Sequence, residues 1–150
     1  MIVSPDIEAR RRWMGLLARA GHDAIEAQLS AAPPLPPHAR LRGPETGLVM
    51  LRGRAGGDGA AFNLSEMTVT RCAVSLPGGT VGHAYVAGRD QQKAELAAVL
   101  DAALQDPGRQ AELLDAVIAP LAEAEADARA AEARKAAATR VQFFTMANMR

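Results

Sequence analysis

The sequence predicts an α+β fold, in which a small, mostly antiparallel sheet is flanked by helices from both ends of the chain and followed by a strand-like C-terminal tail. Residues 67–76 and 80–87 are rich in Val, Thr and small residues, and a Pro-Gly-Gly turn separates them, which is typical of a β-hairpin. Residues 94–104 place Ala and Leu at spacings of three and four, which indicates a helix. The 150 residues suit a single domain, and with only 3% aromatic residues its core must consist mainly of Ala, Leu and Val.

Two helices are expected in residues 4–32, before the sheet. Ser4 is placed to cap the first helix, Gly21 ends it, and Asp23 is placed to cap the second. Four of the five residues 33–37 are proline, so this segment is expected to be a stiff, extended connector.

The sheet core is expected in residues 38–87. Gly43-Pro44 predicts a tight turn within it, and the glycine cluster at residues 56–59 predicts a longer connection. The expected strands are residues 38–42, 47–54, 67–76 and 80–87.

Helices are expected again in residues 90–138. Asp90 is placed to cap the first of them, Pro107-Gly108 ends it, and Pro120 restarts the pattern in an Ala-rich helix that has little bulk to bury. Such a helix is usually a strut or a surface that lies against another chain. Residues 139–146 then return to strand composition and contain two of the three phenylalanines of the chain.

Composition argues against several functions. Lys plus Arg and Asp plus Glu both number 17, so the charge gives no case for a nucleic-acid or membrane surface. No apolar run approaches the roughly 18 residues that span a bilayer, and the N-terminus is too charged for a signal peptide. Cys72 is the only cysteine, which argues against a disulfide framework or a Cys-based zinc site and favours a cytoplasmic protein.

Two segments have the composition of an anion site. Gly56-Gly57-Asp58-Gly59 offers backbone N–H groups to a phosphate, but it lacks the ending of a P-loop, and a plain hairpin loop is the simpler interpretation. Gly88-Arg89-Asp90 lies at a strand-to-helix junction, where Arg89 and, one turn on, Lys93 would hold a phosphate. The alternative is that Asp90 only caps the helix and that Arg89 forms an ion pair.

Other polar side chains give weaker signals. Arg52, Arg54 and Arg71, on neighbouring strands, would either bind an anion or form a solvated sheet face. His83 is the one histidine considered as an acid–base group, although a packed or partner-facing histidine is the simpler interpretation. The three histidines show no metal-ligand spacing, and Cys72 within a strand predicts a buried small residue rather than a nucleophile. The residues alone therefore predict no catalytic and no metal site.

Several sequence blocks nevertheless stand out together. They are ETGLV at 45–49, GGDG at 56–59 with FNL at 62–64, TVTRCAV at 68–74, GHAYVAGRD at 82–90, VIAPL at 117–121, TRVQFFTM at 139–146, and an Arg-rich segment that ends in Trp13-Met14. In order and spacing they resemble the PhnG family, a subunit of the bacterial carbon–phosphorus lyase system, over nearly the whole chain. The Pro-rich connector, and Gln142 where the family commonly has an acidic residue, depart from the family pattern.

The resemblance implies a role in phosphonate catabolism within a complex. PhnG-like proteins assemble with PhnH-, PhnI- and PhnJ-like subunits into a core with two copies of each. With the PhnH- and PhnI-like subunits and a PhnL-like accessory ATPase homologue, they support the transfer of the ribose 5-triphosphate of Mg-ATP to methylphosphonate, with release of adenine. The nucleosidase chemistry is attributed to the PhnI-like subunit. Mg-ATP is then the substrate of the complex, and this chain is expected to bind no cofactor and to carry no catalytic residue.

The sequence is accordingly interpreted as an assembly subunit of a multi-subunit transferase. Phe143 and Phe144, with Arg140 and Met146, are expected to contact partners. A competing hypothesis makes the chain a contributor to the nucleotide or phosphonate pocket. The expected ligand residues are then Arg89, Lys93, Arg71 and His83. The other alternative is a free-standing homodimeric binding module without catalytic activity.

Overall fold

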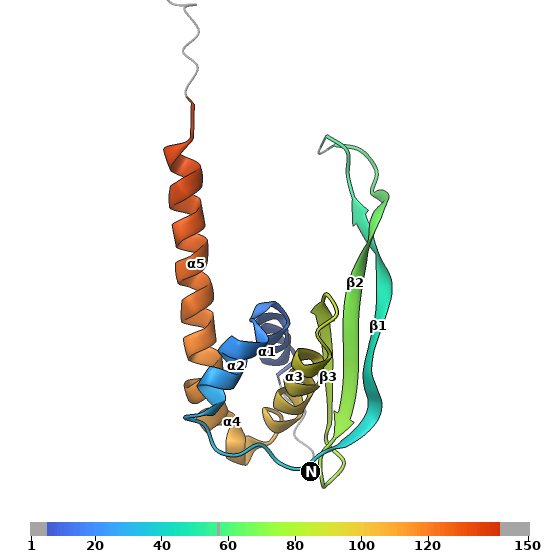
Figure 1. The fold of residues 1–150 in the computed structure, drawn as a ribbon, viewed down its shortest axis with the longest axis vertical. Coiled ribbons are helices and arrows are strands. Elements are labelled where there is room, and N and C mark those ends of the chain that lie inside the picture. The colour runs from blue at the N-terminus through green and yellow to red at the C-terminus, as the bar shows by residue number, and fades with distance from the viewer. Residues whose placement is uncertain (1–5, 57, 142–150) are drawn as a thin grey trace, which may run out of the picture.

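The computed structural model describes residues 6–56 and 58–141 and confirms the α+β class. Within these residues one antiparallel sheet, in the order β1-β2-β3, lies beside a layer of helices (Figure 1). The elements are α1 Ile7–Arg19, α2 His22–Leu29, β1 Ala39–Gly53, β2 Phe62–Ser75, β3 Val81–Ala87, α3 Gln91–Ala103, α4 Pro107–Leu113, the π-helical turn η1 Leu114–Ile118 and α5 Ala119–Ala138.

Strand β1 is one continuous strand of 15 residues, so the prediction of two strands joined by a tight turn at Gly43-Pro44 is wrong. The chain stays extended there, and the pairing with β2 shifts register between Arg42 and Glu45. Pro44 has no N–H to donate, and an edge strand tolerates such a residue at an irregularity because its outer side needs no ladder hydrogen bond. A bulge rather than a turn therefore absorbs the Gly-Pro pair.

The hairpin between β2 and β3 forms as predicted. The two strands pair from Val69–Ala87 to Ser75–Val81, and both turn glycines, Gly78 and Gly79, have positive φ. Alternate residues of β3 are buried, and those between them are exposed. The sheet thus has one face in the core and one open face.

The core face of the sheet is covered by α3, and the core is built largely from Ala, Leu and Val, as predicted. Gly82 of β3 is the point of closest approach. A Cβ atom at this position would overlap the carbonyl oxygen of Ala98 and lie 2.6 Å from the backbone N of Ala102. Because glycine has no Cβ, the backbone of α3 lies directly against the strand.

A buried carboxylate, Asp101, joins three elements of the core. Asp101 is fully buried and accepts hydrogen bonds from Arg10 Nε (3.1 Å) and Nη2 (2.8 Å) and from Trp13 Nε1 (2.9 Å), both on α1. Its Oδ2 also accepts from the backbone N of His83 on β3, at 2.9 Å. Burying a charge is costly unless it is paired and hydrogen-bonded, and here both oxygens are satisfied. The network holds α1, α3 and β3 in one register.

Helix caps were predicted with mixed success. Asp6, rather than Ser4, is the N-cap of α1, and its Oδ1 accepts from the N–H of Glu8 at 3.1 Å; Ser4 lies outside the described residues. The prediction that Asp23 caps α2 is wrong, because the helix begins at His22, two residues earlier than a cap at Asp23 would place its start. Gly21 occupies the N-cap position in an extended conformation, so Asp23 falls inside the first turn, where it favours the positive end of the helix.

Pro120 does not interrupt the helical run at the C-terminal side of the core. Helix α4, turn η1 and helix α5 follow one another without a break, contrary to the expected restart at Pro120. In a regular α-helix the proline ring would clash with the carbonyl four residues earlier, at Ala116. The π-helical turn widens the helix there and removes this conflict.

Two segments project from the body to the same side of the molecule (Figure 1). One is α5, which beyond the buried Leu121 is almost entirely exposed. The other is the outer part of the β1–β2 hairpin, residues 47–68, here called the hairpin arm. Five large apolar side chains of the arm are at least 40% exposed: Leu48, Met50, Leu51, Phe62 and Leu64.

The predicted strand of residues 139–146 is not formed in the part of the tail that the structure describes. Helix α5 ends at Ala138, and the described residues 139–141 belong to no strand; Val141 is 69% exposed. The remaining residues of the segment, including the expected contact residues Phe143, Phe144 and Met146, lie outside the described residues. Among the described helices, none is long and apolar enough to cross a membrane.

Candidate functional site

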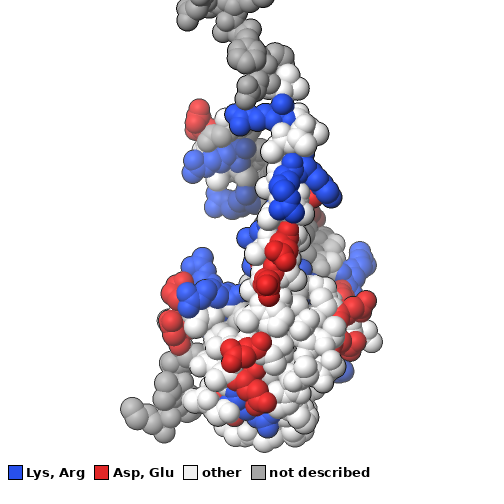
Figure 2. Space-filling model, turned by 90° about the vertical axis from the view of Figure 1, so that its left-hand side faces the viewer, with Lys and Arg blue, Asp and Glu red and all other residues white. Residues whose placement is uncertain are grey.

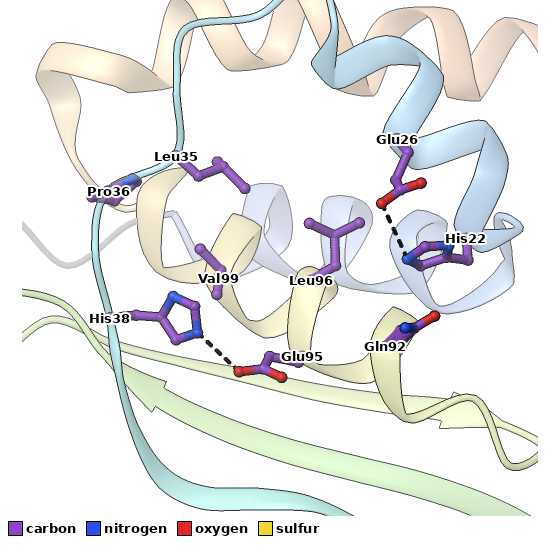
Figure 3. Close-up of a pocket in the computed structure, with 9 residues that line it drawn as sticks. All are labelled: His22, Glu26, Leu35, Pro36, His38, Gln92, Glu95, Leu96 and Val99. Atoms are coloured by element: carbon purple, nitrogen blue, oxygen red, sulfur yellow. Dashed lines mark hydrogen bonds and ion pairs between the residues drawn. The ribbon is translucent and has the colours of Figure 1, made fainter.

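A hollow in the described surface lies between α2, the Pro-rich connector and α3 (Figure 3). It has a volume of about 630 Å³. Apolar side chains of the connector and of α3 form part of its lining, and histidine–carboxylate pairs stand on two of its sides. The lining residues are His22, Glu26, Leu35, Pro36, His38, Gln92, Glu95, Leu96 and Val99.

One side of the cavity is held by Glu95 of α3. Its carboxylate accepts two hydrogen bonds from Arg40, each 2.7 Å long, and its Oε1 lies 3.0 Å from His38 Nε2. The Arg40 guanidinium, and next to it the His38 ring, hold the pKa of Glu95 below its ordinary value, although partial burial opposes this shift. Because Arg40 offsets its charge, Glu95 is a structural link between β1 and α3 more than a free base for chemistry.

The opposite side is formed by the first turns of α2. His22 Nε2 lies 3.6 Å from Glu26 Oε1, and its Nδ1 lies 3.5 Å from Asp23 Oδ1. One ligand atom from each of these three residues lies within 4.8 Å of the others, the only such group among the described residues. The side chain of Asp23 is fully exposed, and the group does not include His38 or Glu95. The two sides therefore do not converge on one metal centre.

Sequence reasoning missed this cavity for a physical reason. His22 and His38 lie 16 residues apart, with no spacing that suggests a shared site. The connector between them returns the chain across α3, and Leu35 and Pro36 bring it against Leu96 and Val99. The nearest signal in the sequence was the Pro-rich connector itself, which fixes an extended path but not its direction.

Lys93, one of the expected phosphate ligands, is occupied elsewhere in the structure. Its side chain is buried, and Nζ donates to the backbone oxygen of Ala18 near the end of α1, at 2.8 Å. Burial lowers the pKa of Lys93, and the nearby carboxylate of Asp90 opposes this shift. The predicted cap is confirmed, because Asp90 Oδ1 accepts from the N–H of Lys93 at 2.9 Å. Lys93 thus ties α1 to α3.

Arg71 and His83 lie instead on the open face of the sheet. Arg71 stands opposite Glu45 on β1 and Tyr85 on β3, and its Nε donates to Glu45 Oε1 at 2.6 Å. Hydrogen bonds to Tyr85 and Glu45 raise the pKa of Arg71. His83 is the next exposed residue along β3 from Tyr85, and Arg89 is exposed beyond the end of that strand. The four expected ligand residues are thus divided between this open face, the junction beyond it and the buried contact of Lys93.

Of the two interpretations of Arg52, Arg54 and Arg71, a shared anion site is not formed. Arg52 pairs with Asn63 near the tip of the arm, whereas Arg71 pairs with Glu45. Seven residues of strand, about 23 Å at the usual rise, separate Arg52 from Glu45. The sequence suggested a cluster because the long single hairpin was not foreseen.

Two simpler interpretations are confirmed. The described residues of the glycine cluster lie in the turn between β1 and β2, as a hairpin loop does; Gly57 lies outside them. Cys72 is buried, its Sγ lies 3.4 Å from the carbonyl oxygen of Arg42, and burial raises the pKa of its thiol. A thiol in this environment is a poor nucleophile.

Charge on the surface is mixed rather than of one sign. On the face that carries α5, acidic side chains lie nearer the base of the projecting helix and basic ones toward its outer end (Figure 2). The sequence of α5 has the same order, with Glu123, Glu125 and Asp127 before Arg134 and Lys135. This order follows the helix dipole, which favours acids near the N-terminus and bases near the C-terminus.

Comparison with known proteins adds a family. The family model described as phosphonate metabolism protein PhnG matches residues 8–148 of the chain. The chain is also 46% identical over 142 residues to the alpha-D-ribose 1-methylphosphonate 5-triphosphate synthase subunit PhnG of Rhizobium meliloti (strain 1021). That alignment covers 93% of this chain and 89% of the relative.

Proposed function

The chain belongs to the PhnG family of phosphonate metabolism proteins, and we propose that it is a structural subunit of the carbon–phosphorus lyase core complex. The observation that carries this proposal is the 46% identity, over 93% of the chain, to a protein named as a subunit of a synthase. The exposed apolar side chains of the hairpin arm support it, since a surface of this kind is typical of a protein that packs against others.

The complex is proposed to make the product that the name of the relative states, a ribose 1-methylphosphonate 5-triphosphate. In this transfer the bond between C1′ of the ATP ribose and N9 of adenine breaks, and C1′ bonds to an oxygen of methylphosphonate. The proton of that phosphonate oxygen passes to adenine, which leaves, and the triphosphate stays on C5′. Mg-ATP is the substrate of the complex and not a group resident in this chain.

The proposed partners are PhnH-, PhnI- and PhnJ-like subunits, two copies of each with this chain, and a PhnL-like accessory ATPase. The fold offers two surfaces for them. The hairpin arm exposes large apolar side chains, and α5 extends beyond Leu121 with few contacts to its own body. Both project to the same side, so a partner that contacts one can contact the other (Figure 1).

In this proposal the chain supplies no catalytic residue. The arrangement of its polar groups supports this view, since Lys93 donates to a backbone oxygen and Arg71 is paired with Glu45. Neither side chain is free to bind a phosphate without giving up an existing partner. Arg89 and His83 remain exposed, and Arg89, the permanent cation of the two, is the residue to test.

The first experiment is co-expression with the three core partners, followed by purification through a tag on a partner. We expect the chain to co-purify in a stable complex. A Leu48→Asp, Met50→Asp variant of the arm should reduce recovery at least tenfold, because a charge in an apolar contact is left without a partner. Leu41→Asp, at an exposed apolar position outside the arm, is the matched control and should leave recovery within twofold.

The second experiment separates a structural role from a catalytic contribution. Adenine release from Mg-ATP and methylphosphonate is measured with complexes that contain Arg89→Ala. We expect an unchanged rate and unchanged assembly. Loss of the rate with intact assembly would place this chain in the nucleotide or phosphonate pocket. A chain that forms a well-behaved oligomer and ignores the partners would instead be a free-standing binding module.

A further inference from the structure

The hairpin arm has an open backbone edge. Strand β2 pairs with β1 along its length, but it pairs with β3 only from Val69 to Ser75. Beyond that point, on the β3 side, the N–H of Gly88 still donates to the oxygen of Thr68 at 2.9 Å. No strand among the described residues continues the pairing along residues 62–67 of β2. In the part of the chain that the structure describes, the sheet thus has an unfilled strand position in line with β3.

The backbone of β2 is oriented to receive a strand at this position. Successive residues of a strand direct their backbone groups to alternate edges. Since Thr68 faces the β3 side, Glu66 directs its N–H and C=O to the same open edge. The neighbouring side chains of Phe62 and Leu64 are 45% and 62% exposed. Natural proteins usually protect such an edge with charges or bulges. Residues 62–67 carry one charge, at Glu66, and one register shift, between Asn63 and Ser65, and the rest of the edge is a template for another strand.

The chain contains one further segment of strand composition, which follows α5. Residues 141–146, VQFFTM, are six residues long, the same length as the open edge at residues 62–67. They contain β-branched and aromatic residues that favour strands. Only Thr139 and Arg140 separate them from the end of α5. The segment therefore starts where the projecting helix stops.

In the described residues, the arm of the same chain stands apart from the end of α5, where this segment begins (Figure 1). Two linking residues span at most about 7 Å. Helix α5 lies mainly against η1 and α2, and Arg19 of α1 forms an ion pair with Glu125; Val141, after the end of α5, is 69% exposed. Helix and arm project as two separate elements (Figure 1). A second copy of the chain has no such restriction, because its own α5 can approach the open edge from outside.

We propose that residues 141–146 of one copy add as a strand to residues 62–67 of β2 in a second copy, so that two chains exchange their C-terminal segments. Because the same surface is used on both copies, the exchange closes as a symmetric dimer. Backbone pairing would supply affinity, as in other cases of strand addition. Successive side chains of a strand alternate between its faces, so Phe143 and Phe144 would lie on opposite faces, with Phe144 against the apolar side chains near the edge. The faces of the arm stay available for other contacts.

The test uses the full chain alone, so its outcome is independent of partner subunits. Light scattering after size-exclusion chromatography measures the mass, and amide hydrogen exchange follows residues 62–67 at high and low protein concentration. We expect a dimer in which the amide of Glu66 is protected, and loss of both properties on dilution. Phe144→Asp should raise the dimer Kd at least about 30-fold, the effect typical of a central aromatic anchor. Asn148→Asp, beyond the segment, is the matched control and should change little.

A change at the edge tests the other side of the same contact. Glu66→Pro removes the N–H that faces the open edge, and an edge position tolerates proline. It should weaken the dimer as much as Phe144→Asp, whereas Glu66→Ala, which keeps the N–H, should not. A monomer whose Glu66 amide exchanges rapidly at all concentrations would refute the proposal. Protection that is independent of concentration would also refute it, because the segment would then be docked within its own chain.

Discussion

Asp101→Ala is the substitution that tests the account of the core most directly. Asp101 is fully buried and receives four hydrogen bonds, two from Arg10, one from Trp13 Nε1 and one from the backbone N–H of His83. Alanine removes the acceptor and leaves these donors facing each other around a small void. Three elements, α1, α3 and β3, lose their common link.

The expected cost follows from the environment of each donor. Removing one partner of a buried ion pair typically costs about 3–5 kcal/mol. The side chain of Arg10 is 28% exposed, so its guanidinium can recover some hydration, which lowers its share. Trp13 is 1% exposed, so its Nε1 has no such route, and an unsatisfied buried donor costs about 1–3 kcal/mol. We therefore expect a loss of about 3–5 kcal/mol of unfolding free energy, a large part of the stability of a typical domain.

Urea unfolding, followed by far-UV circular dichroism, measures this loss, and thermal unfolding should show a fall in Tm of ~10 °C. Asp101→Asn keeps one acceptor oxygen and should lose roughly half as much. Asp127→Ala, at an exposed position of α5, is the control and should stay within about 0.5 kcal/mol of the parent. A loss below about 1 kcal/mol for Asp101→Ala would show that the network does not hold the core together.

Two further predictions concern packing and pH. Gly82→Ala should lower the free energy of unfolding, measured in urea, by about 1–3 kcal/mol, because its Cβ would overlap the Ala98 carbonyl oxygen. Gly47→Ala is the control, since a Cβ there meets no atom within 4 Å. Equal stability of the two variants would contradict the close approach at Gly82. The pKa of Glu95 in the folded chain should lie below the ordinary value of a glutamate. The stability that comes from its pairing is therefore full above about pH 4.3, the pKa of a glutamate in an unfolded chain, and is lost as the pH falls through the folded pKa. In Arg40→Met the pKa of Glu95 should rise toward the ordinary value, and an unchanged carboxyl titration in NMR spectra would show that Arg40 is not its cause.

The elements that the sequence predicted well are those set by local chemistry. The β2–β3 hairpin follows from Pro77-Gly78-Gly79 between two β-branched runs, and Asp90 caps α3 as its position suggests. The errors arise where tertiary context decides between two local outcomes. Gly43-Pro44 is compatible with a turn or with a bulge, and only the partner strand selects the bulge. Pro120 is compatible with a break or a π-helical turn, and continuous packing selects the turn.

Side-chain partners were harder to predict than elements. Lys93 was expected to bind a phosphate because it follows a strand-to-helix junction. No local pattern in the sequence shows that its Nζ instead meets the backbone oxygen of Ala18 near the end of α1. Asp101 was overlooked although it is an acid within an otherwise apolar stretch of α3, the one signal that a buried pair existed. Its partners, Arg10 and Trp13, lie about 90 residues away, so only the folded chain identifies them. Long-range polar contacts of this kind have no period in the sequence.

The separation between body and projections decides how the proposals can be tested. The Asp101 network and the Gly82 contact lie among α1, α3 and β3, whereas the hairpin arm consists of the outer parts of β1 and β2. Large apolar side chains of the arm, such as Leu48 and Phe62, are exposed and contribute little to the core. Substitutions there should therefore change association without unfolding the chain, since distant sites with no shared partners act additively. A Leu48→Asp variant that unfolds in urea like the parent but fails to assemble would locate an interface; one that unfolds more readily would show that the arm is part of the core after all.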